Sequence, residues 1–530
     1  MSKNYLKKAK YAQLSRAVGT KANMRKEERK RLRRLPEAAE TGFIPDAAAG
    51  FGAEPHSKNE AKEVAKRAEH AVAELEITAP EQGVQPEVDP SLGKPATKAN
   101  LLLFTLPTML SMLVMSTMGV VDNVFVSRLI NPIAMGAVGI VWPFISFALA
   151  IGFMLGVGGN ALVARKIGEG LHHQARENFS LITLTAFILS IVVSVVGLLA
   201  PDFILNILGV DDFLRPMAMD YLTPMLYFMP MIILGMAFQQ FLITEGKAYI
   251  IAISTVVSGL TSAGLNYVFI YQMDMGLRGA SFASSIGFTI PTVIGLVYFT
   301  FMRKGNLYFV MPKFDYMALG RACVNGASEM VTMLAASITA TLMNNVIIRI
   351  EGPEAVAASA IMFAAVGVFS ALFVGYASGV APIISYNYGK GDTQNLRRTY
   401  VNSLQLIGVI SVASIGIAWL FTNPIIWVFD VPVGTNMHDM ARRGTRILAL
   451  GFVFMGINAF ASMWFTALNN GLVSSILSFF RTLVFVAAAV AVLPRIFGLN
   501  GAWAATPVAE VLGIAMTIAA FKLMKKKYKY

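Results

Sequence analysis

The hydrophobic positions of this chain are concentrated in long runs that begin at Leu101. Each run holds about 20 or more predominantly apolar residues, the length that an α-helix needs to cross a bilayer. Short polar segments separate the runs, so the pattern predicts an all-α membrane protein with twelve transmembrane helices. The expected spans are 101–129, 132–163, 177–200, 214–243, 247–271, 276–302, 318–349, 355–384, 395–421, 444–467, 471–494 and 501–523.

The segment before the first run has a different composition. Residues 1–98 hold 19 of the 44 Lys and Arg residues and 14 of the 31 Asp and Glu residues. Few of them are aromatic or β-branched, which predicts a hydrophilic, mostly disordered tail. Its basic start could bind anionic lipid or nucleic acid, but a solvated segment that helps to fix topology is the favoured interpretation. We expect no nucleic-acid partner.

Basic residues predict the orientation of the helices. They gather in the loops 163–177, 303–321 and 389–398 and in the C-terminal segment 525–530, which all fall on one side of a twelve-span protein. Lys and Arg are enriched in cytoplasmic loops. The sequence therefore predicts a multi-pass protein of the cell inner (plasma) membrane with both termini in the cytoplasm.

The two halves of the hydrophobic region repeat each other. Gly158, Gly168 and Gly170 match Gly379, Gly389 and Gly391 at an offset of 221, and Asp122-Asn123-Val124 matches Asn344-Asn345-Val346 at 222. Six helices are thus duplicated, and because six is even both halves have the same orientation. The expected domains are the tail 1–98, an N-lobe 99–310, a C-lobe 311–524 and a basic C-terminal end 525–530.

Two matched bundles can rock against each other around a central cavity, which favours a transporter with alternating access. No catalytic constellation appears, because none of the five histidines falls within a predicted span. The single cysteine, Cys323, excludes cysteine-based metal sites. We therefore expect no enzymatic activity, no cofactor and no bound metal.

The residues also resemble a known family. The segments VDNVFVSRL, AMGAVGI and GNALVARKIGEG are similar to the first two helices of multidrug and toxic compound extrusion (MATE) transporters. NGASEMVT, GVAPIISYNYGKGD and FTALNNGLVSSILSFFRT are similar to the MepA-like branch. The resemblance covers residues 99–524. It implies two six-helix lobes in a V shape and efflux coupled to H⁺ or Na⁺.

Asp122 is the sharpest candidate for ion coupling. It lies within the first span, and an ionisable residue at membrane depth is costly and usually functional. It could also cap a neighbouring helix. The resemblance implies that Ser262, Asn266 and Ser284 complete a cation site around it. Asn266 replaces an acid that many members of the family carry, which favours protons over Na⁺.

Two further charged residues lie within predicted spans of the second half. Glu329 could be a second coupling site or a counter-ion for substrate, or it could pair with Arg481. Arg481 interrupts an apolar helix and requires an acidic partner, for which Glu510 is the other choice. The sequence leaves these alternatives open.

A substrate cavity needs adaptable and aromatic side chains. Met is flexible and polarisable, and aromatic rings attract organic cations. Ordinary helix packing explains such residues equally well. The cavity candidates are Met115, Met118, Phe144, Phe147, Tyr227 and Asn344.

Together these features predict a secondary active antiporter, expected to be a monomer, that exports small lipophilic or cationic compounds in exchange for H⁺ or Na⁺. The alternative from the same superfamily is a lipid or oligosaccharide flippase. A third interpretation, a membrane-anchored binding protein that acts through its tail, leaves the internal repeat unexplained.

Overall fold

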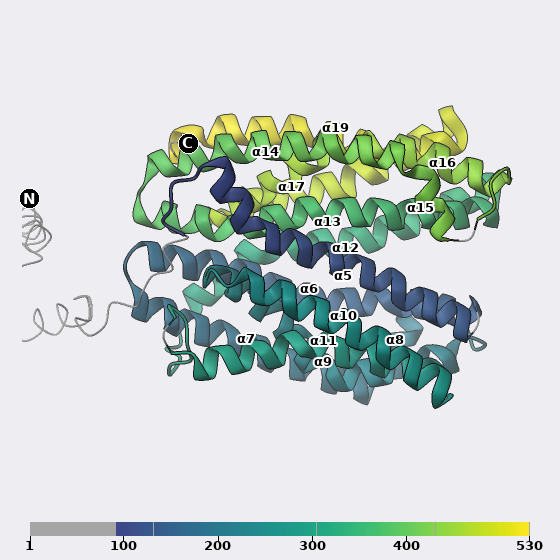
Figure 1. Ribbon diagram of the computed structural model, residues 1–530, viewed down its shortest axis with the longest axis horizontal. Coiled ribbons are helices and arrows are strands. Elements are labelled where there is room, and N and C mark those ends of the chain that lie inside the picture. Colours follow the sequence, from purple (N-terminus) through teal and green to yellow (C-terminus); the bar gives the residue numbers. More distant parts are fainter. Residues whose placement is uncertain (1–91, 131, 304, 430, 529) are drawn as a thin grey trace, which may run out of the picture. The chain divides into compact units, whose positions relative to one another are not determined.

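The computed structural model describes residues 92–530 except 131, 304, 430 and 529. The described residues are almost entirely helical and contain no strand. They form two lobes that lie side by side (Figure 1). The first lobe consists of α5 (Lys98–Leu129), α6 (Pro132–Gly168), α7 (His172–Leu199), α8 (Pro201–Ile207), α9 (Arg215–Thr244), α10 (Ala248–Asn266), the π-helix η2 (Tyr267–Gln272) and α11 (Gly276–Phe301).

The second lobe repeats this order. It consists of α12 (Tyr316–Glu351), α13 (Pro353–Lys390), α14 (Thr393–Leu420), α15 (Thr422–Val428), α16 (Asn436–Ala449), α17 (Phe452–Ala467), α18 (Gly471–Phe479), the π-helix η3 (Phe480–Val484) and α19 (Phe485–Tyr528). The short helices α8 and α15 begin at Pro201 and Thr422, which lie 221 positions apart. The internal repeat predicted from the sequence is therefore a structural repeat.

The described helices provide twelve membrane spans. Ten segments are long and apolar enough to cross a membrane, and the pair α16 and α17, bent by 50°, makes an eleventh span. One of the ten runs over 58 residues, from Gly471 to Tyr528. It is divided at Gly498, whose φ of 58° matches the φ of 56° at Gly276, its repeat partner between the fifth and sixth spans. The division gives the twelfth span.

One predicted span begins earlier than expected. The tenth span was expected at 444–467, but its helix begins at Asn436 and bends before Phe452. In the predicted basic C-terminal segment 525–530, α19 continues to Tyr528 and the ring of Tyr530 packs against Tyr400. Of the predicted tail, residues 1–91 lie outside the described residues, while Leu92 and Ala96 are buried.

The two lobes meet closely at one end of the bundle. This end carries Arg165, Lys166, Arg397 and Arg398, and we call it the basic end. There a Cβ atom on Gly158 of α6 would collide with the backbone carbonyl of Ala322 in α12. Only glycine permits so close an approach of two helix backbones. The lobes are thus packed together at the basic end.

Helix α5 belongs to both lobes. Near the basic end it packs against α13 of the second lobe, and farther along it packs against α10 of its own lobe. Figure 1 shows this helix, in dark blue, passing from one lobe to the other along its length. Its Thr108 hydroxyl donates a hydrogen bond to the carbonyl of Gly375 in α13 at 2.9 Å. One helix therefore connects the seam between the lobes with the interior of the first lobe.

Candidate ion-coupling site

The second half of α5 presents Asp122 to two other helices of the first lobe. The Ser262 hydroxyl and the Asn266 amide of α10 donate to Oδ1 of Asp122 at 3.0 and 2.9 Å. The Ser284 hydroxyl of α11 donates to Oδ2 at 3.0 Å. All four residues named from the sequence thus form one polar group within the membrane-spanning region.

Local features of α10 and α11 explain how the group assembles. Gly287 of α11 lies opposite Ser262, and a Cβ atom there would approach the Ser262 Cβ to 3.1 Å. The missing side chain lets the two helices converge, so that the hydroxyls of Ser262 and Ser284 reach the same carboxylate. Directly after Asn266 the chain widens into η2, and such π-helical turns are frequent at functional sites.

One atom of the group has no partner. Asn266 is fully buried, and its Oδ1 makes no hydrogen bond among the described residues. It lies beside a half-buried carboxylate that already accepts three hydrogen bonds. Two carboxylate oxygens, two hydroxyl oxygens and this amide oxygen form an oxygen-rich group, the kind of environment that holds a proton or a hard cation.

Tyr221 of α9 is a neighbour of the site that the sequence did not reveal. Its side chain is buried, and its hydroxyl lies within range of both Asp122 and Ser284. The sequence analysis missed it, because Tyr221 lies near the start of a long span and no motif marks it. It adds a fourth helix to the surroundings of the carboxylate.

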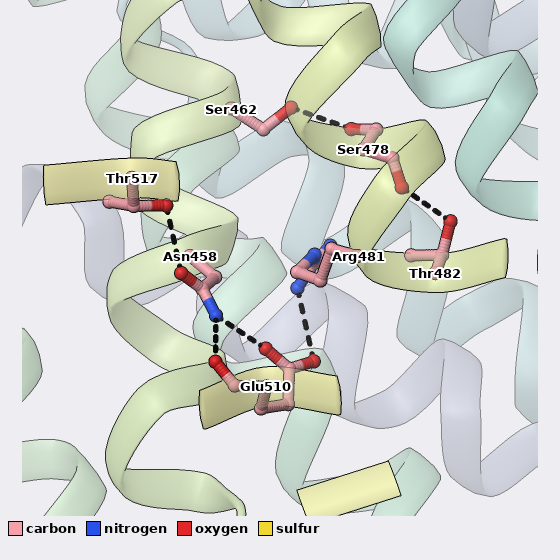
Figure 2. A network of polar contacts seen from close by, with 7 residues as sticks. All are labelled: Asn458, Ser462, Ser478, Arg481, Thr482, Glu510 and Thr517. Carbon is pink, nitrogen blue, oxygen red and sulfur yellow. Dashed lines mark hydrogen bonds and ion pairs between the residues drawn. The ribbon is translucent and has the colours of Figure 1, made fainter. Parts of the chain in front are cut away.

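A second polar network lies inside the other lobe, and Figure 2 shows it. Arg481 of η3 donates to Oε1 of Glu510 in α19 at 3.4 Å. The Asn458 amide donates to Oε2 of the same carboxylate at 2.7 Å, and Thr517 donates to the Asn458 oxygen. Both charged side chains are nearly enclosed, with exposed fractions of 11% and 8%. Within this network, the charges of Arg481 and Glu510 neutralise each other.

The structure therefore answers one question that the sequence left open. The acidic partner of Arg481 is Glu510, while Glu329 is half-buried in α12 within electrostatic range of Arg481. Among the described residues, Glu329 takes part in no ion pair. Its role as a coupling site or counter-ion stays a prediction.

The predicted cavity residues do not form one group with Asp122. Met118 is buried and its Sδ and Cε atoms pack towards Gly259 and Gly287 of the first lobe. Met115 and Phe144 are half-buried, whereas Phe147, Tyr227 and Asn344 are exposed. Met118 thus packs against the two helices that complete the coupling site. All six residues stay predictions as substrate contacts.

The fold and the site describe a multi-pass membrane protein with two homologous lobes and a carboxylate held within one of them. A family model described as MatE matches residues 107–268 and 329–491, two segments that begin 222 positions apart. These segments make up more than half of the chain. The protein belongs to the MatE family.

Curated relatives and solved structures agree with this assignment. The chain is 22% identical over 433 residues to the multidrug export protein MepA of Staphylococcus haemolyticus, covering 80% of this chain and 92% of the relative. It is 22% identical over 444 residues to MepA of Staphylococcus aureus strain MRSA252, covering 81% and 93%.

Two solved structures share the fold. One is an outward-facing multidrug resistance MATE family transporter of the MOP superfamily, with a TM-score of 0.77 at 20% identity, covering 84% of this chain and 99% of that one. The other is a MOP superfamily transporter from Pyrococcus furiosus, with a TM-score of 0.78 at 20% identity and the same coverage. Its description reports a binding pocket of reverse polarity that suggests a different function.

Proposed function

We propose that the protein is a secondary active antiporter that exports small lipophilic or cationic compounds in exchange for H⁺ or Na⁺. The observation that carries the proposal is the Asp122 carboxylate, held inside a membrane-spanning lobe by Ser262, Asn266 and Ser284. The similarity to multidrug export proteins over four-fifths of the chain supports the substrate class.

The composition of the site favours the proton as the coupling ion. Asp122 is its only acidic member, and its other members are neutral hydroxyl and amide groups. A single carboxylate is sufficient to bind and release one proton. One pH unit supplies about 1.4 kcal/mol per proton, enough for about a tenfold gradient of an uncharged compound.

The state of the lobes supports alternating access. Glycines such as Gly158 let the lobes pack together at the basic end. At the other end of α12, Ile348 and Ile350 are exposed at 49% and 37%. We place the basic end in the cytoplasm, because Lys and Arg favour that side. With this orientation the proposed state of the lobes is one closed to the cytoplasm. We also propose that the protein works as a monomer in the plasma membrane.

Transport by the purified full-length protein in liposomes tests the proposal. A fluorescent organic cation is followed while a pH gradient or a Na⁺ gradient is imposed separately. Asp122→Asn removes the titratable charge, and Asp220→Asn, at an exposed acid paired with Arg278, is the matched control. Uptake driven by the pH gradient and lost only in the first variant is expected. Gradient-driven transport that survives Asp122→Asn would refute this role.

A further inference from the structure

The segment directly before α5 is folded onto the opposite lobe. We call residues 92–97 the strap. The backbone N–H of Ala96 donates to Oδ1 of Asn395 in α14 at 2.8 Å, and Nδ2 of Asn395 donates to the carbonyl of Lys94 at 3.2 Å. The Asn402 amide donates to the carbonyl of Ala96 at 2.6 Å. The first helix of one lobe therefore begins on the surface of the other.

The strap docks in a defined position on the second lobe. Ala96 is 2% exposed and Leu92 is fully buried, so the strap contributes apolar packing as well as backbone hydrogen bonds. The Asn395 amide is itself oriented, because its Nδ2 also donates to Oδ1 of Asn387 in α13 at 3.0 Å. The side chain of Asn395 is thus used as both donor and acceptor, which fixes the backbone of the strap in one register.

The strap continues into the seam between the lobes. About three turns into α5, the Thr108 hydroxyl donates to the carbonyl of Gly375 in α13. A Cβ atom on Gly379, one turn farther along α13, would press against Thr105 and Thr108. The first part of α5 is therefore held on the second lobe by the strap and by this seam together.

The other end of α5 is held in its own lobe. Asp122 receives its hydrogen bonds from Ser262 of α10 and Ser284 of α11. One continuous helix thus connects the strap, on one lobe, with the coupling carboxylate, in the other. A movement of either end of α5 therefore strains the contacts at the other end of the helix.

A similar arrangement precedes the second lobe. The segment before α12 docks on the first lobe, where the N–H groups of Asn306 and Leu307 donate to the Glu245 carboxylate. The Val310 N–H donates to the Ser180 hydroxyl of α7 at 3.0 Å. In both lobes, the segment that leads into the first helix is anchored on the other lobe, at the basic end.

We propose that Asn395 and Asn402 are positioning residues of the transport cycle, which hold the start of the Asp122 helix on the opposite lobe and so keep the basic end closed. The inference rests on the proposed function, because it assigns the strap a step in alternating access. Opening the basic end requires α5 to leave α13. The hydrogen bonds between the strap and the two asparagines must break at that step. Their strength therefore sets the population of the closed state.

A cysteine reporter in the seam measures this population without transport. In the full-length protein, Cys323→Ala removes the single native cysteine, and Thr105→Cys places a thiol at a fully buried position beside Gly379. The rate of labelling by a charged maleimide, in detergent, reports how often the seam opens. The double variant Asn395→Ala/Asn402→Ala is expected to label at least fivefold faster. Gln394→Ala, an exposed amide next to Asn395, should label at the parent rate.

A pair of truncations tests the same point if the double variant does not fold. The form 92–530 keeps the strap, whereas the form 99–530 lacks Lys94 and Ala96 and so removes the strap partners of both asparagines. Only the shorter form should be labelled faster than the full-length reporter protein. Parent-like labelling of folded 99–530 protein, or of the folded double variant, overturns the inference.

The labelling experiment separates this inference from the proposed function. If the seam opens faster in the double variant but Asp122→Asn transports normally, the role of the strap is supported and the coupling role of Asp122 is refuted. If the seam opens at the parent rate but Asp122→Asn loses transport, the role of the strap is refuted and the coupling role of Asp122 is supported.

Discussion

The carboxylate of Glu245 accepts a hydrogen bond from the backbone N–H of Leu307, 62 positions later in the chain, at 2.6 Å. It also accepts one from Asn306 at 3.1 Å. Glu245 directly follows α9, outside the span, and burial raises its pKa to about 7. The buried carboxylate of Glu245 therefore holds in place the segment between α11 and α12, which joins the two lobes.

This relationship predicts a pH-dependent stability. The folded protein holds a proton on Glu245 more tightly than the unfolded chain does, because the pKa is raised from 4.5. The stabilisation is complete below pH 4.5 and is lost as the pH rises through about 7. Glu245→Gln removes this titration, so its melting temperature in detergent should fall less between pH 5 and pH 8 than that of the parent. Equal slopes for the two proteins would contradict the prediction.

Asp122→Asn should separate folding from transport. The substitution keeps the volume of the side chain but removes a charge that is expensive within a membrane. We expect an unchanged or slightly higher melting temperature and at least a tenfold loss of gradient-driven efflux in liposomes. Asp220→Asn should retain the parent rate, since Asp220 is exposed and paired with Arg278. A variant that transports at the original rate with the original pH dependence would make Asp122 a structural residue and direct attention to Glu329.

Gly326→Ala should prevent the lobes from closing at the basic end. A Cβ atom at Gly326 of α12 would collide with the backbone carbonyl of Met154 in α6, and a backbone cannot turn aside as a side chain can. We expect a loss of about 1–3 kcal/mol in stability and strongly reduced efflux. The control lies in the same helix, because Gly320 has open space around it. Gly320→Ala should be neutral or slightly stabilising, and equal effects of the two substitutions would argue against the collision.

Removing one member of the enclosed ion pair should cost much more than removing both. Arg481→Met leaves Glu510 as an unpaired charge, which costs about 3–5 kcal/mol. In Arg481→Met/Glu510→Gln, the Asn458 amide still has an oxygen to bind, and most of the loss should be recovered. The exposed pair of Arg278 and Asp220 provides the comparison, where Arg278→Met should cost at most about 1 kcal/mol. Chemical denaturation in mixed micelles measures these three variants and the parent, and a loss in the double variant as large as that in Arg481→Met would contradict the prediction.

Much of the architecture could be predicted from the sequence because the relevant forces are local. Apolar runs of sufficient length must form helices in a bilayer, since the backbone has no other hydrogen-bond partners there. The repeat between Gly158 and Gly379 followed from identity at a constant offset. The group around Asp122 followed from the family resemblance, and the structure brings Ser262, Asn266 and Ser284 together as that resemblance implied.

The parts that could not be predicted depend on contacts between distant residues and the backbone. Asn395 meets Ala96 across 299 positions, and Asn402 meets it across 306. Backbone groups carry no sequence signal, so nothing in the pattern connects these asparagines with the strap. Glu245 was missed for the same reason, because it binds N–H groups of Asn306 and Leu307 and its neighbours Gly246 and Lys247 are typical of a loop.

The attachment of α5 to the second lobe also constrains how the protein is made. Ala96 leaves the ribosome 299 residues before its partner Asn395. At roughly 5–20 residues per second, this interval lasts about 15–60 s. During that time the first helix is inserted without the neighbours that cover its starting end. The first lobe is therefore not a self-sufficient assembly unit, and its completion waits for the translation of α13 and α14.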